Sequence, residues 1–380
     1  MTTRANFWQT TRNILSLPLD IVRGRAVVRI ERRLTTPRWM TYVVPVISII
    51  VALLLGAILL AAAGVNPLEA YNTVLTGAFT SLDGLAGTAV KSIPLILCGL
   101  GVALAFRTLL WNIGAEGQLF MGAFAAAGVA LYVIPDAPPF LLIPAVLLAG
   151  ALAGALWGFI PGALKGLLGV NEIITSLMLN YVAILWVDYL IYGPWRDPQG
   201  YGFPGTAPFE AVRFPRLPGT RVHLGLLIGI LAAVLIAFAL QRTRWGYETR
   251  VIGENQQAAR YAGMSLVKNI LLVMFLSGGL AGLAGASELC GLTNPRLQIG
   301  LSPGYGYTAI IVAWLARLNP YAIVLVSFLF AGLLVGGDSL QMAMNLPRAT
   351  VYILQGIVLF AVLGGELFVR YRVRIARQEE

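Results

Sequence analysis

The feature that most constrains this chain is a series of long, almost uninterrupted apolar runs. A helix that crosses a bilayer needs roughly 20 largely apolar residues. We identify about ten such runs, near residues 42–64, 88–106, 110–133, 140–161, 172–192, 222–241, 267–287, 304–316, 320–337 and 348–369. With 58% hydrophobic and 12% charged residues, the composition lies outside the range of soluble domains. The sequence therefore predicts an all-α integral membrane protein, a polytopic bundle of about ten transmembrane helices.

Basic residues at the two ends of the chain predict its orientation. The net charge is +10, and arginines gather before the first apolar run and after the last one. Such residues accumulate on the cytoplasmic side of a membrane, where they also meet anionic lipid head groups. We therefore expect both termini to be cytoplasmic, an even number of crossings, and contact with membrane lipids. The position of this charge argues against nucleic acid as a partner.

Polar segments between the runs indicate how the chain is organised. We predict a basic cytoplasmic segment over residues 1–41, one transmembrane domain over 42–369, and a basic cytoplasmic tail over 370–380. Residues 193–221 are rich in proline and glycine, which is typical of an irregular outer loop. Within 242–266, Asn255 favours a helix start and Gly263 a helix end, which predicts one short cytoplasmic helix. Apolar residues lie between Arg12 and Arg23, which is compatible with a segment that lies on a membrane surface.

Glycines recur at helical spacing inside two of the runs. One set repeats every four residues and forms a bare stripe: Gly150, Gly154, Gly158, Gly162 and Gly166. Gly278, Gly282 and Gly285 form a second small face. Small residues let membrane helices approach closely, so we assign both sets to helix packing.

Polar side chains within the apolar runs are costly to bury and are candidates for function. In residues 111–122, Asn112 and Glu116 lie four residues apart, on one face of the predicted helix, whereas Gln118 lies about 200° around it from Glu116. The side chains of Gln118 and Glu116 must then contact different neighbouring segments. Two alternatives stay open: a gate or substrate path near the inner face, or capping by Asn112 with Glu116 facing the helix dipole.

A second polar stripe follows on the next predicted helix but one. Glu172, Ser176 and Asn180 recur at helical spacing, with Asn171 and Thr175 beside them. The stripe either bonds across to other helices or lines the translocation path. The complete set of path or gate candidates is Asn112, Glu116, Gln118, Asn171, Glu172, Thr175, Ser176 and Asn180.

The sequence offers little support for catalysis or metal binding. It contains no phosphate-binding loop and no metalloprotease or serine-hydrolase motif. Its single histidine, His223, and its two cysteines, Cys98 and Cys290, have no metal-ligand spacing. We expect no catalytic residue, no metal site and no cofactor bound by this chain. A secondary transporter driven by an ion gradient remains an alternative class.

Three segments resemble one family of transport proteins. Residues 112–123, Asn-Ile-Gly-Ala-Glu-Gly-Gln-Leu-Phe-Met-Gly-Ala, resemble a signature of permease subunits in ABC importers for simple sugars, nucleosides and branched-chain amino acids. Residues 253–263 and 277–285 resemble the cytoplasmic coupling segment of that family and the helix that follows it. The resemblance covers about residues 42–369, and it implies a transport subunit rather than an enzyme.

The resemblance also implies partners. In such importers the short cytoplasmic helix docks on an ATPase subunit that binds ATP and magnesium, and the permease pairs with a second permease, which we expect to be a different homologous chain. The residues that the resemblance assigns to ATPase coupling are Gly253, Glu254, Asn255, Ala258, Ala259, Arg260 and Gly263. An extracytoplasmic solute-binding protein would dock on the outer loop, for which Trp195, Arg196 and Asp197 are the candidates.

The solute is the least constrained prediction. Residues 170–181 and 192–204 look most like the nucleoside branch of the family. Ribose, another simple sugar or a branched-chain amino acid stays an alternative solute for the same machine, because all of these molecules need a polar path. The expected location is the bacterial plasma membrane, with the chain crossing it several times.

Overall fold

The computed structural model describes residues 21–23, 26–32 and 37–377. It divides the chain into two compact units, the first made of Met1–Leu68 with Ala349–Glu380 and the second of Glu69–Arg348. These limits differ from those of the predicted domain over 42–369. The predicted surface segment over 12–23 lies outside the described residues, except for Ile21–Arg23.

The first unit joins the two ends of the chain. It contains α2 (Arg38–Ala62), α14 (Arg348–Arg370) and the strands β1 (Ile21–Arg23), β2 (Ala26–Arg32) and β3 (Tyr371–Arg377). The strands form an antiparallel sheet in the order β1-β2-β3, and β2 pairs with β3 from Ala26↔Arg377 to Arg32↔Tyr371. Helices make up most of the described chain, as predicted, and these three short strands are an addition to the predicted all-α class. Basic and β-branched residues alternate in β2 and β3, which favours strands, but the partner of each strand lies at the other end of the chain.

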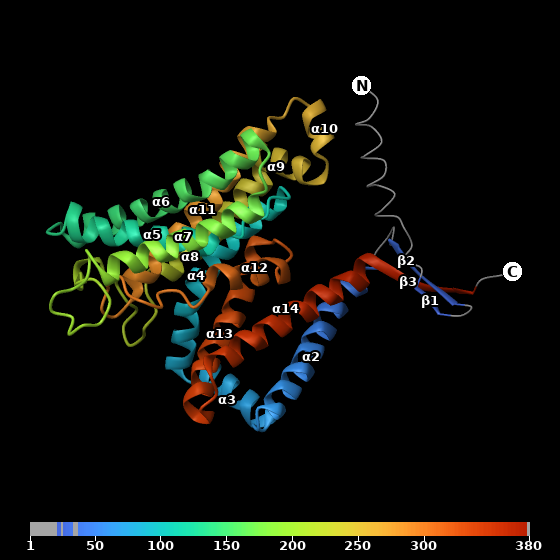
Figure 1. Cartoon of the computed structure of the whole chain (residues 1–380), viewed down its shortest axis with the longest axis horizontal. Coiled ribbons are helices and arrows are strands. Elements are labelled where there is room, and N and C mark those ends of the chain that lie inside the picture. Colours follow the sequence, from blue (N-terminus) through green and yellow to red (C-terminus); the bar gives the residue numbers. More distant parts are fainter. Residues whose placement is uncertain (1–20, 24–25, 33–36, 378–380) are drawn as a thin grey trace. The chain divides into compact units, whose positions relative to one another are not determined.

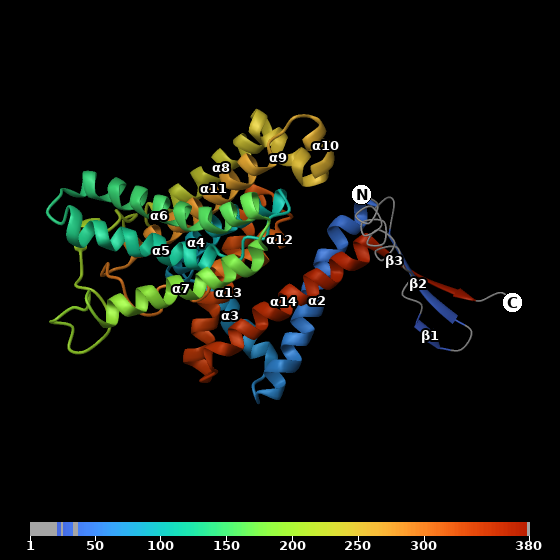
Figure 2. The ribbon, with the colours of Figure 1, turned by 45° about the horizontal axis from the view of Figure 1, so that its top comes forward.

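The second unit is built of helices, which Figures 1 and 2 show from two directions. Its longer helices are α3 (Pro67–Phe79), α4 (Leu82–Arg107), α5 (Ala115–Gly128), α6 (Pro139–Leu168), α7 (Glu172–Tyr192), α8 (Gly225–Arg242), α11 (Leu266–Gly291) and α13 (Pro320–Met344). Shorter ones are η1 (Val129–Val133), η2 (Glu210–Val212), α9 (Arg244–Glu254), α10 (Gln256–Tyr261) and α12 (Tyr305–Leu315).

The lengths of these helices confirm a multi-pass membrane protein. In the described part of the chain, seven helices are long and apolar enough to cross a membrane, or up to eight if α2 and α3 form one bent span. The apolar helices Tyr305–Leu315 and Ala349–Gly365 are shorter. The number of ten crossings stays a prediction.

Glycines bring α5, α6 and α11 into contact at the centre of the second unit. A Cβ added at Gly154 would collide with the backbone oxygen of Gly278, and one added at Gly282 would collide with that of Gly150. At Gly122 of α5, an added Cβ would collide with Gly282. The predicted role of the glycine faces in helix packing is confirmed.

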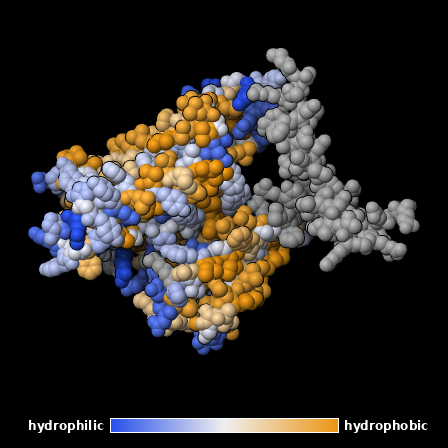
Figure 3. Space-filling view, in the orientation of Figure 1, coloured by the Kyte–Doolittle hydropathy of each residue, from blue (hydrophilic) through white to orange (hydrophobic). Residues whose placement is uncertain are grey.

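The two ends of the second unit differ. Figures 1 and 2 show the long loop after α7 at one end of the helices and α9 and α10 at the other. In Figure 3 hydrophobic residues cover much of the visible flank of this unit, whereas hydrophilic residues gather towards its ends. This is the distribution expected for helices with their flanks in lipid and their ends in water.

The loop before α11 contains more helix than predicted. Two helices, α9 and α10, occupy the segment where one was expected. The Thr243 hydroxyl caps α9 by accepting the Gly246 N–H, and Thr249 and Ile252 are buried on its inner face. The Thr243 cap and the spacing of the buried residues of α9 are both features of the local sequence. The arginines of this segment favoured a polar loop instead.

Candidate functional site

The chain before α5 is not helical, and most of the polar candidates gather around it. The predicted helix over 110–133 begins only at Ala115, with Gly114 as its cap residue. The expectation that Asn112 and Glu116 share one helical face is therefore wrong, because Asn112 lies outside the helix. Both side chains are nonetheless buried.

Asn112 links this segment to α11 and α4. Its Nδ2 donates to Gln118 Oε1 at 3.0 Å and to Ser277 Oγ at 2.8 Å, and its Oδ1 accepts from Gln118 Nε2 at 3.1 Å. Ser277 in turn donates to the Gly101 carbonyl of α4 at 2.7 Å. The reciprocal pair of amides satisfies polar groups that would otherwise be unpaired in an apolar interior.

The polar stripe of α7 binds the backbone of the same segment. Asn180 Oδ1 accepts the Gly117 N–H at 2.8 Å, and its Nδ2 donates to the Ile113 carbonyl at 2.9 Å. Ser176 Oγ accepts the Ile113 N–H at 3.3 Å. A backbone without its own helical bonds needs such partners at membrane depth. We call the set Asn112, Glu116, Gln118, Ser176, Asn180 and Ser277 the buried polar network.

The stripe begins at an ion pair. Glu172 is buried in the first turn of α7, and its Oε2 lies 2.8 Å from Lys165 Nζ of α6. Asn171 is exposed and caps α7 by accepting the Ile173 N–H, and Thr175 is partly exposed. Asn171 and Thr175 are thus the path or gate candidates that a molecule outside this chain can reach.

Glu116 joins the beginnings of two helices. It lies in the first turn of α5, and its Oε2 accepts the N–H of Gly306, in the first turn of α12, at 2.6 Å. The carboxylate is only 2% exposed. An added Cβ at Gly306 would collide with the backbone of Glu116, so only glycine allows this approach. The Glu116 carboxyl thus lies at the N-termini of two helices, whose partial positive charges favour its ionised form.

The predicted span 304–316 contains only a short helix. An α-helix of the length of α12, 11 residues, extends about 16 Å, which is too short for a hydrocarbon core of about 30 Å. The preceding residues 292–304 are not helical. They bind the outer loop, where Thr206 N donates to the Leu297 carbonyl at 2.9 Å. Beyond α12, Arg107 Nη2 of α4 donates to the Leu318 carbonyl at 2.8 Å.

The coupling candidates surround α10. Asn255 Oδ1 accepts the N–H groups of Gln257 and Ala258, and Gly263, with φ of +77°, follows the helix. The predicted cap and end of this helix are confirmed. Glu254, Asn255, Ala258, Arg260 and Gly263 are exposed, whereas Ala259 is fully buried and Gly253 packs against the Arg107 carbonyl of α4.

The docking candidates shape the outer loop. Trp195 stacks on Phe124 of α5 with a centroid distance of 5.2 Å. Arg196 Nη2 donates to the Gly202 carbonyl, and Asp197 Oδ1 accepts the Gln199 N–H. Of the three, Arg196 is the exposed one.

His223 anchors the end of the same loop. It is buried against Gly291 and Phe214, and its Nδ1 accepts the Gly225 N–H at the start of α8. Burial, with a further contribution from the charge of Arg216, lowers the pKa of His223 from 6.5 to about 4. The imidazole is therefore neutral at pH 7, as its acceptor role requires.

One charged pair within the helices escaped the sequence analysis. Lys91 of α4 forms an ion pair with Asp338 of α13, and the two side chains are 24% and 42% exposed. Lys91 is a rare charge within an apolar run, and Asp338 directly follows another run. Such charges beside apolar segments were the signal in the sequence. Their pairing depends on the packing of two helices that are distant in sequence.

Comparison with known proteins gives a consistent result. Residues 84–363 match the family described as branched-chain amino acid transport system / permease component. The glucose ABC transporter permease protein of Haloferax volcanii is 40% identical over 361 residues, which is 92% of this chain and 94% of that protein. The guanosine ABC transporter permease protein of Bacillus subtilis is 37% identical over 84% of this chain and 92% of that protein. The nucleoside ABC transporter permease protein of Lactococcus lactis is 32% identical over 84% of this chain and 90% of that protein.

Proposed function

The chain belongs to the family of permease components of branched-chain amino acid transport systems, and we propose that it is the membrane-spanning subunit of an ATP-binding-cassette importer for nucleosides. It is a transport component and not an enzyme. The observation that carries the nucleoside proposal is the likeness, over most of the chain, to permease proteins for guanosine and for nucleosides.

A simple sugar is the second candidate solute. The glucose permease protein of Haloferax volcanii has a higher identity to this chain than the two nucleoside relatives. The family description names branched-chain amino acids as a further class. A nucleoside contains a ribose, so a path that accepts its sugar hydroxyls has chemistry in common with a path for a free sugar.

In the proposed machine this chain has three kinds of partner. Two ATPase subunits, which bind ATP and magnesium, dock at the end that carries α9 and α10. A second permease of homologous sequence completes the path. A solute-binding protein docks on the outer loop near Trp195, Arg196 and Asp197. The exposed positions Glu254, Asn255, Ala258, Arg260 and Gly263 support an ATPase contact through α10, with Gly253 and Ala259 behind them.

The buried polar network takes a positioning role in this proposal. Its side chains are occupied by one another and by the backbone, so they hold the segment before α5 and the start of α12 in place. That segment and α12 form the gate, and Asn171 and Thr175 face the path. Glu172 fixes the end of α7 beside them through Lys165.

We further propose ten crossings, with both termini in the cytoplasm of a bacterial cell and the chain in its plasma membrane. The arginines near α9 and at both ends of the chain support this orientation. Residues 292–315 then form one broken crossing, which is tolerated because its irregular half is bound by protein. All of residues 42–369 act together as one permease domain.

Single cysteines test this orientation. Cys98 and Cys290 are buried, so new cysteines report without interference. A membrane-impermeant maleimide should label Gln199→Cys in intact cells and Tyr261→Cys only after permeabilisation, since both residues are exposed. Labelling of both positions from the same side would contradict the topology.

Uptake by cells tests the solute and the machine together. Cells with and without this gene are given labelled guanosine, adenosine, glucose and leucine, and the protein is purified from native membranes to identify associated chains. We expect loss of nucleoside uptake and an associated ATPase. Loss of glucose uptake alone would favour the sugar, whereas gradient-driven uptake by the isolated chain without an ATPase would overturn the importer.

A further inference from the structure

We propose that the second unit carries a binding site for one anionic phospholipid, where α8, α9 and α11 meet. The site has two adjoining parts. The apolar groove runs between α6 and α11, and the basic pocket lies at the end of the unit that carries α9 and α10. Neither part belongs to the buried polar network.

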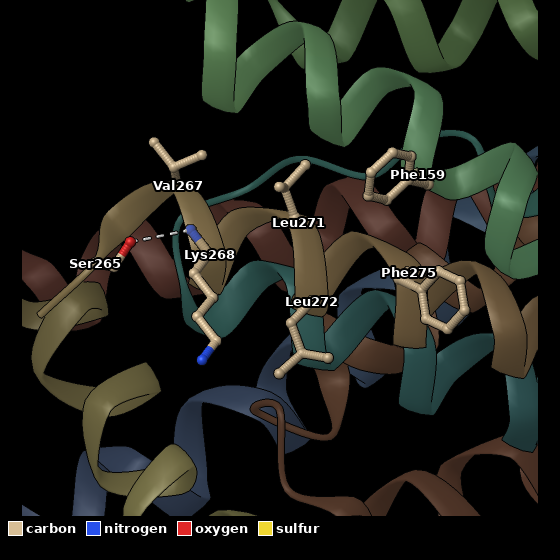
Figure 4. Close-up of a pocket in the computed structure, with 7 residues that line it drawn as sticks. All are labelled: Phe159, Ser265, Val267, Lys268, Leu271, Leu272 and Phe275. Carbon is tan, nitrogen blue, oxygen red and sulfur yellow. Dashed lines mark hydrogen bonds between the residues drawn. The ribbon is translucent and has the colours of Figure 1, made fainter.

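The apolar groove has the dimensions and lining of an acyl-chain site. Its volume is about 450 Å³, and its apolar lining comes from Phe159, Val267, Leu271, Leu272 and Phe275. Figure 4 shows Phe159 on α6 and the other side chains along α11. Phe159, Val267 and Leu272 are between 37% and 39% exposed, so the groove opens on the flank of the unit.

The basic pocket continues the groove at its polar end. It has a volume of about 730 Å³ and is lined by residues of the end of α8, of α9 and of the turn before α11. Ser265 and Lys268 line both cavities. Figure 4 shows the Lys268 ammonium directed away from Phe159. A molecule that lies in the groove therefore meets this ammonium at its end.

Among the residues that line the pocket, cations outnumber acids. Arg242, Arg244 and Lys268 line it, and Glu248 is the one acid among the lining residues. The three cations take part in none of the ion pairs found among the described residues. The N-termini of α9 and α11 add their partial positive charges at Thr243 and Ser265.

Together these features fit a phospholipid better than a free anion or a protein. A free anion has no use for the apolar groove, and a soluble partner would not reach the flank of a membrane helix. Basic pockets between transmembrane helices select anionic head groups, and this end faces the cytoplasmic leaflet in the proposed topology. The head group would also touch Gly263 and Met264, which connect α10 to α11.

The test measures lipid retained by the purified transporter. Protein in nanodiscs of equal parts phosphatidylglycerol and phosphatidylethanolamine is transferred to detergent, and bound lipid is quantified by native mass spectrometry. We expect wild type to retain one phosphatidylglycerol. The variant R242Q/R244Q/K268Q should retain at least about fivefold less, since each cation near a lipid surface contributes attraction. Arg213→Gln, an exposed arginine on the outer loop, is the matched control and should behave as wild type.

Two further variants separate the parts of the site. Lys268→Arg keeps the charge and should retain phosphatidylglycerol, whereas Leu272→Asn makes the groove polar and should reduce retention with the cations intact. Equal retention by R242Q/R244Q/K268Q and Arg213→Gln would overturn the proposal. Displacement of the bound lipid by inorganic phosphate would also overturn the proposal, because it would indicate a site for any anion. Displacement of the lipid by the ATPase subunit would overturn it as well, because it would indicate a protein-docking surface.

Discussion

Glu116 illustrates how single residues stabilise an irregular backbone inside a membrane protein. Transfer of a carboxylate from water to an apolar interior is costly unless hydrogen bonds and positive charge compensate for it. Here the Gly306 N–H and the N-termini of α5 and α12 provide that compensation. The carboxylate in return satisfies a helix end that would otherwise lack a partner.

Removal of this acceptor should destabilise the start of α12. In Glu116→Ala the Gly306 N–H stays buried without a partner, which costs about 1–3 kcal/mol. We expect a lower unfolding temperature and a larger loss of uptake than of protein in the membrane. Glu116→Gln keeps an acceptor and should fall between wild type and Glu116→Ala. The control is Glu69→Ala, which removes an exposed carboxylate of α3. If Glu116→Ala showed wild-type uptake, the role of Glu116 would be limited to helix capping.

His223 predicts a dependence of stability on pH. Burial lowers the pKa of His223 from the ordinary 6.5 to about 4 in the folded protein, so the unfolded chain binds more protons between these two values. The folded state is therefore favoured fully above pH 6.5, and this contribution, roughly 3 kcal/mol, is lost as the pH falls towards 4. Hydrogen exchange of residues 214–224 should increase over this range. His223→Asn keeps an acceptor without titrating and should remove the dependence; an unchanged pH profile in this variant would contradict the assignment.

At the scale of elements, the contact of α6 with α11 depends on the absence of side chains. Gly154 and Gly278 each leave no room for a Cβ against the backbone of the other helix. Such approach increases van der Waals contact where lipid offers no hydrophobic driving force. The stripe is not uniform, however, because an added Cβ at Gly166 would lie 3.5 Å from Val267 Cγ1, an ordinary contact distance.

Two alanine substitutions in the same stripe should therefore differ. Gly154→Ala forces α6 and α11 apart and should cost roughly 1–3 kcal/mol, as overpacking does. Gly166→Ala meets only ordinary contacts and should leave stability equal to or slightly above that of wild type. Thermal unfolding in detergent compares the two. Equal melting temperatures would show that the helices can separate at no cost.

At the scale of the whole permease, contacts connect α9 with α12, which is part of the proposed gate. α9 packs on the end of α4 at Gly253, and Arg107 of α4 holds the Leu318 carbonyl beyond α12. At the start of α12, the Gly306 N–H donates to Glu116 of α5. These contacts are contiguous, so a displacement of α9 and α10 by an ATPase has a physical route to α12.

Charge reversal on α10 tests that route at its origin. Arg260 is exposed, and Arg260→Glu would change a positive contact on the ATPase into a negative one. We expect the ATPase to copurify poorly and uptake to fall at least about tenfold, the effect of 1.4 kcal/mol, while the melting temperature of the permease stays the same. Arg213→Glu on the outer loop makes the same change of charge at the other end and is the control for copurification of the ATPase. Unchanged uptake in Arg260→Glu would contradict the coupling role of α10.

Local sequence determined the features that depend on neighbouring residues. The apolar runs determined that the chain crosses a membrane as helices, because a buried backbone must satisfy its own hydrogen bonds. Asn255 and Gly263 determined the limits of α10, since capping involves residues within one turn. The glycine spacing determined which face of α6 packs closely, and residues 112–123 pointed to the family.

Tertiary structure decided what depends on residues that are distant in sequence. It decided that the segment before α5 is irregular, because Asn180 and Ser176 of α7 replace its helical bonds. It decided that the helix within 304–316 is only 11 residues long, that Lys91 meets Asp338, and that β2 finds its partner in β3. The physical reason is the same in each case. The hydrogen bond or ion pair that stabilises one segment comes from a second segment far away in the sequence, so the local sequence of either segment does not reveal the contact.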